Sequence, residues 1–155
     1  MIPVSGISIV PASRIPAGSV FVIRQQGTPQ LALRATDPRD PAVLCAVVLE
    51  TGKIPVFMRL QSDPQCIWFE GKALVRVCVP CVSRLDGNEL PGNLVFRDET
   101  LGIISSDTNT QVCVDVQTGN VLDLGTCGDP HWYVSAWELG VLGYSDEFVP
   151  VFQKS

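Results

Sequence analysis

Two short pairs of residues in this sequence could do chemistry together. Cys78 and Cys81 are separated by Val79 and Pro80, and Cys127 precedes His131, the single histidine of the chain, by four residues. Zinc takes four thiolate or imidazole ligands in a tetrahedron, and two such pairs can supply them. The sequence therefore contains a candidate Cys3His zinc site, made of Cys78, Cys81, Cys127 and His131.

The surroundings of the first pair predict that its thiols diverge. Residues 73–82 form an apolar, valine-rich run, which is typical of a central strand. In an extended strand, residues three apart point to opposite faces, so we expect Cys78 and Cys81 to look away from each other as small buried side chains. Only a kink at Pro80 would bring the sulfurs together. The pair also lacks a following helix, whose N-terminus activates redox Cys-x-x-Cys motifs.

Nucleophilic catalysis would have to use the second pair. Any Cys–His or Ser–His scheme needs a base beside the nucleophile, and His131 is the only histidine. Cys127 lies four residues away, with Asp129 between them, but the segment matches no local signature of a catalytic family. We therefore expect no catalytic residue and no cofactor. The alternative is a metal-binding protein or hydrolase-type enzyme that uses Cys78, Cys81, Cys127 and His131, with zinc as its cofactor.

An aromatic segment near the C-terminus offers candidate binding residues. Trp132, Tyr133 and Trp137 fall close together, and aromatic side chains of this kind either fill a core or anchor an interface. Residues 133–139 could also form one or two helical turns, which Gly140 would stop. We take Trp132, Tyr133 and Trp137 as the candidate binding surface.

The composition narrows the class of partner. Of the 155 residues, 46% are hydrophobic and 17% are charged, and the formal net charge is −5. Nucleic-acid binding needs clustered Lys and Arg, and the eleven basic residues here are scattered. No run approaches the roughly 20 apolar residues of a membrane-spanning helix, and the N-terminus lacks the features of a signal peptide. We expect a cytoplasmic protein with reduced cysteines and without nucleic-acid or membrane partners.

The pattern of strands and turns predicts a single all-β domain over residues 1–155. About ten short strands recur at the spacing typical of sandwiches and barrels, separated by Gly and Pro turns. No strand is followed by a convincing amphipathic helix, which argues against a parallel βαβ design. The fold expected is an antiparallel β-sandwich or a partly open barrel. Pro3, Pro11 and Pro16 interrupt residues 1–16, so this N-terminal arm is at best an edge strand near residues 7–10.

Together these observations predict a non-enzymatic binding or protein-interaction module that assembles with itself or with another protein. A second alternative to the metal protein or enzyme is a small-ligand carrier with an apolar pocket inside a barrel.

Overall fold

The chain is all-β, as its sequence predicts. The computed structural model describes residues 6–83, 90–97, 99–108, 110–123 and 132–155. Two single turns of 3-10 helix, η1 (Ala12–Arg14) and η2 (Val79–Cys81), are the helical elements of these ranges. Among the described residues, none belongs to a helix of the length and hydropathy needed to span a bilayer.

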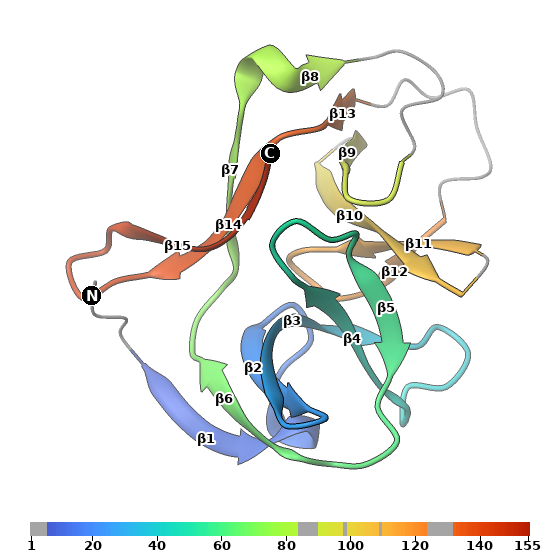
Figure 1. Cartoon of the computed structure of the whole chain (residues 1–155), viewed down its shortest axis with the longest axis vertical. Coiled ribbons are helices and arrows are strands. Elements are labelled where there is room, and N and C mark those ends of the chain that lie inside the picture. Colours follow the sequence, from blue (N-terminus) through green and yellow to red (C-terminus); the bar gives the residue numbers. More distant parts are fainter. Residues whose placement is uncertain (1–5, 84–89, 98, 109, 124–131) are drawn as a thin grey trace.

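Twelve strands form the larger of two sheets (Figure 1). Its path runs through β1 (Ile7–Pro11), β6 (Gln65–Phe69), β2 (Val20–Gln25), β3 (Thr28–Thr36), β4 (Leu44–Leu49), β5 (Val56–Arg59), β10 (Thr100–Asp107), β9 (Leu94–Arg97), β13 (Trp132–Val134) and β8 (Val82–Ser83), while β11 (Thr110–Asp115) and β12 (Val121–Leu122) branch from β10. The path does not return to its start, so the sheet is not closed into a barrel, and the arrangement is that of a sandwich. Neighbouring strands are antiparallel except at one seam, where Val56 of β5 pairs in parallel with Ser106 of β10.

The smaller sheet has the order β15 (Phe148–Lys154), β14 (Trp137–Leu142) and β7 (Leu74–Val77), and it is antiparallel throughout. The register of β14 against β15 shifts between Leu139 and Gly140. A Cβ atom at Gly140 would lie 2.5 Å from the ring of Phe148, so only glycine fits at this irregularity.

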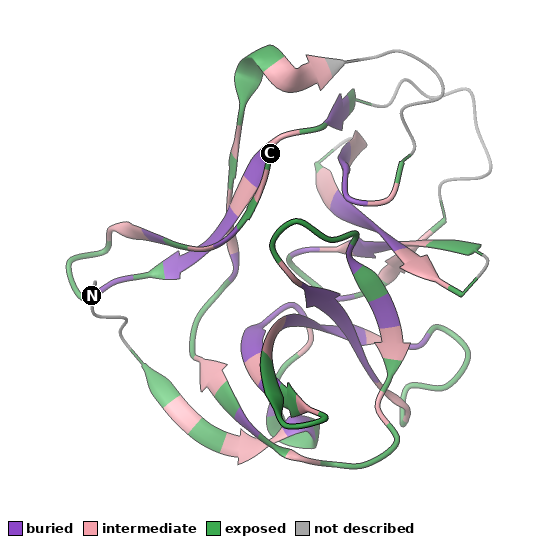
Figure 2. Ribbon diagram, in the orientation of Figure 1, coloured by how far each residue is buried: buried purple, intermediate pink, exposed green. Residues whose placement is uncertain are grey.

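Alternation of side chains along β2 and β3 buries both faces of the larger sheet. Val20 and Leu33 are cross-strand partners that enter the main core, where they join buried residues of the smaller sheet. The adjacent pair, Phe21 and Ala32, points the other way into a second cluster under the N-terminal segment. Strands that are apolar on both faces are expected where both faces are covered. Figure 2 shows this burial through the centre of the molecule.

The valine-rich run at residues 73–82 is not one continuous strand, and this part of the sequence prediction is wrong. It divides into β7 (Leu74–Val77), the 3-10 turn η2 (Val79–Cys81) and β8 (Val82–Ser83). The physical reason is Pro80, which has no amide hydrogen for a ladder and occupies the first turn of η2. As a result β7 belongs to the smaller sheet and β8 to the larger one, and η2 is a crossover between them (Figure 1).

Candidate functional site

The thiols of Cys78 and Cys81 meet on the turn η2. Cys81 Sγ donates a hydrogen bond to Cys78 Sγ across 3.2 Å. The expectation that these side chains diverge inside a strand is therefore wrong, and so is their expected burial, since Cys78 is exposed and Cys81 is half-buried. In a 3-10 helix, residues three apart eclipse each other, and Pro80 produces this turn.

Backbone hydrogen bonds hold this dithiol turn on both sides. Cys81 N donates to Cys78 O over 2.9 Å, which closes the turn itself. Cys78 N then donates to Ala136 O over 3.0 Å, and Ser135 N donates to Cys81 O over 3.3 Å. Ser135 and Ala136 lie between β13 and β14, which is the second crossover between the two sheets. The dithiol turn therefore sits where both crossovers touch.

The environment of each described thiol decides its reactivity. The pKa of Cys81 is raised, mainly because its thiol donates a hydrogen bond to Cys78, with smaller contributions from desolvation and from the Cys78 charge. Burial raises the pKa of Cys45 and Cys66, and it raises the pKa of Cys113 to about 12. Because the thiolate is the nucleophile, burial and a raised pKa make Cys45, Cys66 and Cys113 poor nucleophiles, whereas Cys78 is exposed to solvent.

The predicted zinc site is only partly within the described residues. Cys78 and Cys81 come together, whereas Cys127 and His131 lie outside the described residues. Among the residues the structure describes, no group of three or more His, Cys, Asp or Glu side chains could hold a metal ion. The Sγ–Sγ distance of 3.2 Å is shorter than the roughly 3.8 Å between two sulfurs of a tetrahedral zinc site with bonds of about 2.3 Å. Zinc at the four residues stays a prediction.

The three candidate aromatic binding residues differ in exposure. Trp132 of β13 is 43% exposed, whereas Tyr133 and Trp137 are buried. The Trp137 ring packs against Phe152 with centroids 5.2 Å apart, and its Nε1 donates to Gly92 O over 2.8 Å. Of the three, only Trp132 presents a large surface to a partner.

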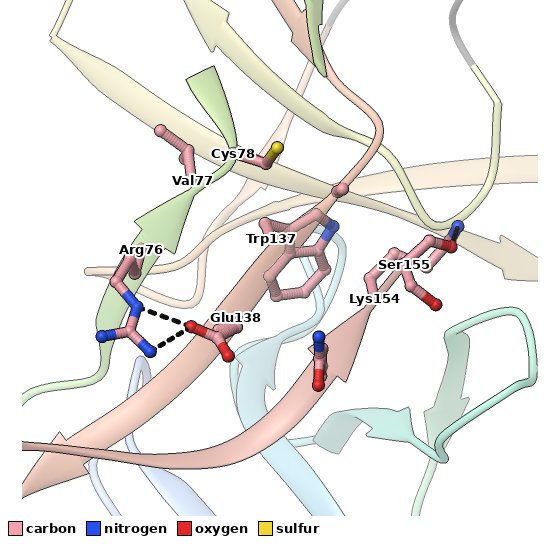
Figure 3. A pocket seen from close by; sticks show the side chains of 9 residues that line it. Arg76, Val77, Cys78, Trp137, Glu138, Lys154 and Ser155 are labelled. Carbon is pink, nitrogen blue, oxygen red and sulfur yellow. Dashed lines mark hydrogen bonds and ion pairs between the residues drawn. The ribbon is translucent and has the colours of Figure 1, made fainter. Parts of the chain in front are cut away.

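A cleft of about 290 Å³ lies beside the dithiol turn (Figure 3). Its lining residues are Arg76, Val77, Cys78, Ala136, Trp137, Glu138, Gln153, Lys154 and Ser155. Arg76 and Glu138, neighbours across β7 and β14, form an ion pair with an Nη2–Oε2 distance of 2.5 Å. The larger sheet is open, so a small-ligand carrier would have to use a cleft such as this one instead of the interior of a barrel.

The outer edge of β1 is a second candidate site, which sequence reasoning located but did not recognise as functional. Within the described chain β1 pairs with β6 alone, so the edge strand expected near residues 7–10 is present. Glu70 N donates to Gly6 O and Ala12 N donates to Pro64 O. In an antiparallel pair, every second residue of a strand directs its N–H and C=O groups toward the partner strand. Gly6 and Ala12 direct theirs toward the β6 side, so the backbone groups of Ile7 and Ile9 point away from β6. The sequence signal was present, because the strand Ile-Ser-Ile-Val-Pro carries no charge.

Exposed isoleucines surround this edge. Ile7 and Ile9 are 55% and 74% exposed, and Ile67, the cross-strand partner of Ile9, is 41% exposed. The opposite face of the strand is covered, since Val10 packs against the second cluster. Figure 2 shows the alternation of exposed and half-buried residues along β1. We refer to Ile7, Ile9 and Ile67 as the isoleucine patch.

An ion-pair bridge ties the loop after β3 to the larger sheet. Arg59 Nε lies 3.0 Å from Asp37 Oδ2, and Arg59 Nη1 lies 3.2 Å from Asp107 Oδ2. Arg39 N also donates to Asp37 Oδ1 over 2.8 Å. These hydrogen bonds hold the pKa of Asp37 below its ordinary value. The bond from Arg39 N contributes most, and the bond from the Arg59 side chain contributes next. One guanidinium thus contacts two carboxylates, and the bridge links the loop after β3 to β5 and β10.

No protein-family model, curated protein or solved structure matches the chain.

Proposed function

We propose that the protein is a non-enzymatic interaction module that associates with a second copy of itself through the outer edge of β1. The single observation that carries this proposal is the outward row of backbone groups at Ile7 and Ile9, beside exposed apolar side chains. An edge strand with unpaired donors and acceptors is a template for pairing with another strand. Pairing two copies of the same edge satisfies those groups.

The register follows from the residues that face outward. If two copies of β1 run antiparallel about an axis at Ser8, Ile7 of each copy lies opposite Ile9 of the other. Two residues that face each other in this way exchange both of their N–H···O bonds. Pro11 is also one of the residues whose backbone groups point away from β6, so its missing amide hydrogen removes no hydrogen bond to β6. The edge is therefore self-complementary, as a twofold interface requires.

The side chains favour the same pairing. The isoleucine patch of each copy would continue into that of the other, which removes exposed apolar surface from water. A chain with a formal net charge of −5 repels its own copies, but β1 contributes no charged side chain to the contact. Natural sheets usually protect an exposed edge with a Lys or an inward charge, and this edge has neither.

The β1 edge is preferred to the aromatic segment because Tyr133 and Trp137 are buried. A cytoplasmic location is part of the proposal. It is supported by cysteines that are free in the described chain, at Cys45, Cys66, Cys78, Cys81 and Cys113, since thiols are kept reduced in that compartment.

The test compares Ile9→Lys with Ile54→Lys in the full chain by sedimentation equilibrium over a wide concentration range. Ile54 is 56% exposed and lies in the β4–β5 connection, at the far end of five strand pairings from β1. We expect dimers for the unmodified protein and for Ile54→Lys, and monomers for Ile9→Lys with an unchanged circular dichroism spectrum. A monomeric unmodified protein, or a dimeric Ile9→Lys, overturns the proposal.

The variant Ile9→Pro tests the backbone contribution by comparison with Ile9→Ala, which also loses the isoleucine side chain but keeps the amide hydrogen. The missing amide hydrogen of Ile9→Pro removes one outward donor and leaves the inward bonds to β6 in place. Dimerisation weaker than that of Ile9→Ala supports strand pairing, whereas equal dimerisation of the two variants shows that two copies associate in another way.

A further inference from the structure

We infer that Cys78 and Cys81 form a site of thiol–disulfide exchange, which closes into an intramolecular disulfide on reaction with a low-molecular-weight disulfide. Neither the self-association of the β1 edge nor the predicted zinc site assigns this reaction to the pair. The inference rests on the geometry of η2, on the unequal exposure of its two thiols, and on the contrast with the buried cysteines.

The geometry places the sulfurs close to bonding distance. They are 3.2 Å apart, and a disulfide bond of roughly 2.05 Å requires them to approach by about 1.2 Å. The turn is already closed by the hydrogen bond from Cys81 N to Cys78 O. Disulfide formation requires the side chains of Cys78 and Cys81 to rotate toward each other within this turn.

The two thiols have different surroundings, and these assign different roles. Cys78 is exposed beside the cleft, where a small disulfide can reach its sulfur (Figure 3). Cys81 is half-buried and points its proton at Cys78, so it is held next to the sulfur that it must attack. Cys78 is therefore the attacking thiol and Cys81 the resolving thiol.

The exchange occurs in two steps that balance. The Cys78 thiolate attacks one sulfur of the small disulfide RSSR, which forms a Cys78–SR bond and releases RS⁻. Cys81 then loses its proton, and its thiolate attacks the Cys78 sulfur, which forms the Cys78–Cys81 bond and releases the second RS⁻. The protein loses two electrons and two protons, and RSSR gains both and becomes two RSH.

The bond would change the protein where its two sheets meet. Cys78 N and Cys81 O both hydrogen-bond to the Ser135–Ala136 crossover. A disulfide fixes the shape of η2 and so fixes the spacing of these two groups. The redox state of the pair thus sets how firmly the β7–β8 crossover is held against the β13–β14 crossover.

The experiment uses the full chain with Cys127→Ser, so that the thiols counted are those of Cys45, Cys66, Cys78, Cys81 and Cys113. The protein is incubated with oxidised glutathione, the remaining thiols are alkylated in denaturant, and intact mass is measured. We expect two of the five thiols to be lost with no retained glutathione. Retention of a single stable glutathione adduct, or equal loss of Cys45 and Cys113, overturns the inference.

Single substitutions separate the roles. With Cys81→Ser we expect the glutathione adduct to accumulate on Cys78, because the resolving thiol is gone. With Cys78→Ser we expect adduct formation at least tenfold slower, and with Cys45→Ser an unchanged reaction. Equal rates for Cys78→Ser and Cys81→Ser would contradict the assigned order of attack, and a circular dichroism spectrum confirms that each variant is folded.

Discussion

Trp137 of the smaller sheet donates its indole N–H to the backbone oxygen of Gly92 over 2.8 Å, and Gly92 lies just before β9 of the larger sheet. Both residues are buried, so this hydrogen bond joins the two sheets in a place that water does not reach. Gly92 has a φ of +99°, which glycine adopts without strain, and a side chain there would meet Lys154.

Removing the hydrogen bond between Trp137 and Gly92 should destabilise the protein. Trp137→Phe keeps most of the ring but leaves Gly92 O without its donor, so we expect a loss of about 1–3 kcal/mol in the free energy of unfolding. Trp137→Ala also removes the packing against Phe152, and we expect a loss of about 3–5 kcal/mol. Urea unfolding measures both. Equal losses for the two variants would show that the hydrogen bond, and not the ring, accounts for the effect.

Acid should weaken the bridge formed by Asp37 and Arg59. The pKa of Asp37 is lower in the folded protein than its ordinary value, so its contribution is fully present above about pH 4. The contribution is lost as the pH falls through the folded pKa, because the folded state must then take up a proton that it binds weakly. We expect unfolding experiments between neutral and acid pH to show a smaller acid dependence for Asp37→Asn.

The matched control for that experiment is Asp146→Asn. Asp146 is exposed in the turn between β14 and β15, with a φ of 57° that asparagine also tolerates. This variant should keep the full acid dependence of the unmodified protein. A parallel decrease in both variants would assign the effect to net charge instead of the bridge.

Oxidation of the dithiol turn should raise thermal stability. A disulfide that closes a loop of four residues stabilises by about 2 kcal/mol in the chain-entropy model. For a domain of this size that corresponds to a Tm increase of roughly 4–8 °C. Calorimetry of the oxidised and reduced Cys127→Ser protein measures the difference, and Cys81→Ser should show none. A lower Tm on oxidation would mean that the bond strains η2.

Zinc analysis tests the predicted Cys3His site. The proposed interaction module needs no metal, so we expect purified protein to contain less than one zinc per chain by elemental analysis. Stoichiometric zinc that disappears in Cys78→Ser and in Cys127→Ser would contradict this expectation and support the metal-protein alternative.

Gly140 provides a test of packing in the smaller sheet. A Cβ atom there would lie 2.5 Å from the Phe148 ring and 2.8 Å from Val149 O. We expect Gly140→Ala to lower the free energy of unfolding by about 1–3 kcal/mol through overpacking. The double variant with Phe148→Leu should recover part of the loss, because a smaller side chain relieves the ring contact. Additive losses would show that the clash with the backbone oxygen dominates.

The strands whose burial is decided by alternation were predictable from the sequence. Apolar residues on both faces at 19–24 and alternating leucines at 30–35 predict two strands, and these correspond to β2 and β3, which pair as a hairpin. The edge strand near residues 7–10 was also predictable, because Pro11 restricts it to the edge. In each of these places, local pattern and tertiary environment favour the same structure.

Local pattern failed where one residue or a distant contact decided the outcome. At residues 73–82 the valines favour a strand, but Pro80 converts the middle of the run into η2, and this conversion brings the two thiols together. Residues 133–139 have a pattern that could form one or two helical turns, and they form parts of β13 and β14 instead. Burial of Trp137 against Phe152 and its bond to Gly92 select the strand there, and both partners are remote in sequence.

The direction of the outward groups on β1 also limits the stoichiometry of the proposed assembly. Within the described chain β1 has one side without a neighbouring strand, and the proposed antiparallel contact about a twofold axis would occupy that side on both molecules. Pro11 at the end of β1 lacks the amide hydrogen that an extended or shifted pairing of the two strands would need. The proposed contact would therefore leave no free side of β1 for a third copy, and an assembly through this edge would stop at two molecules.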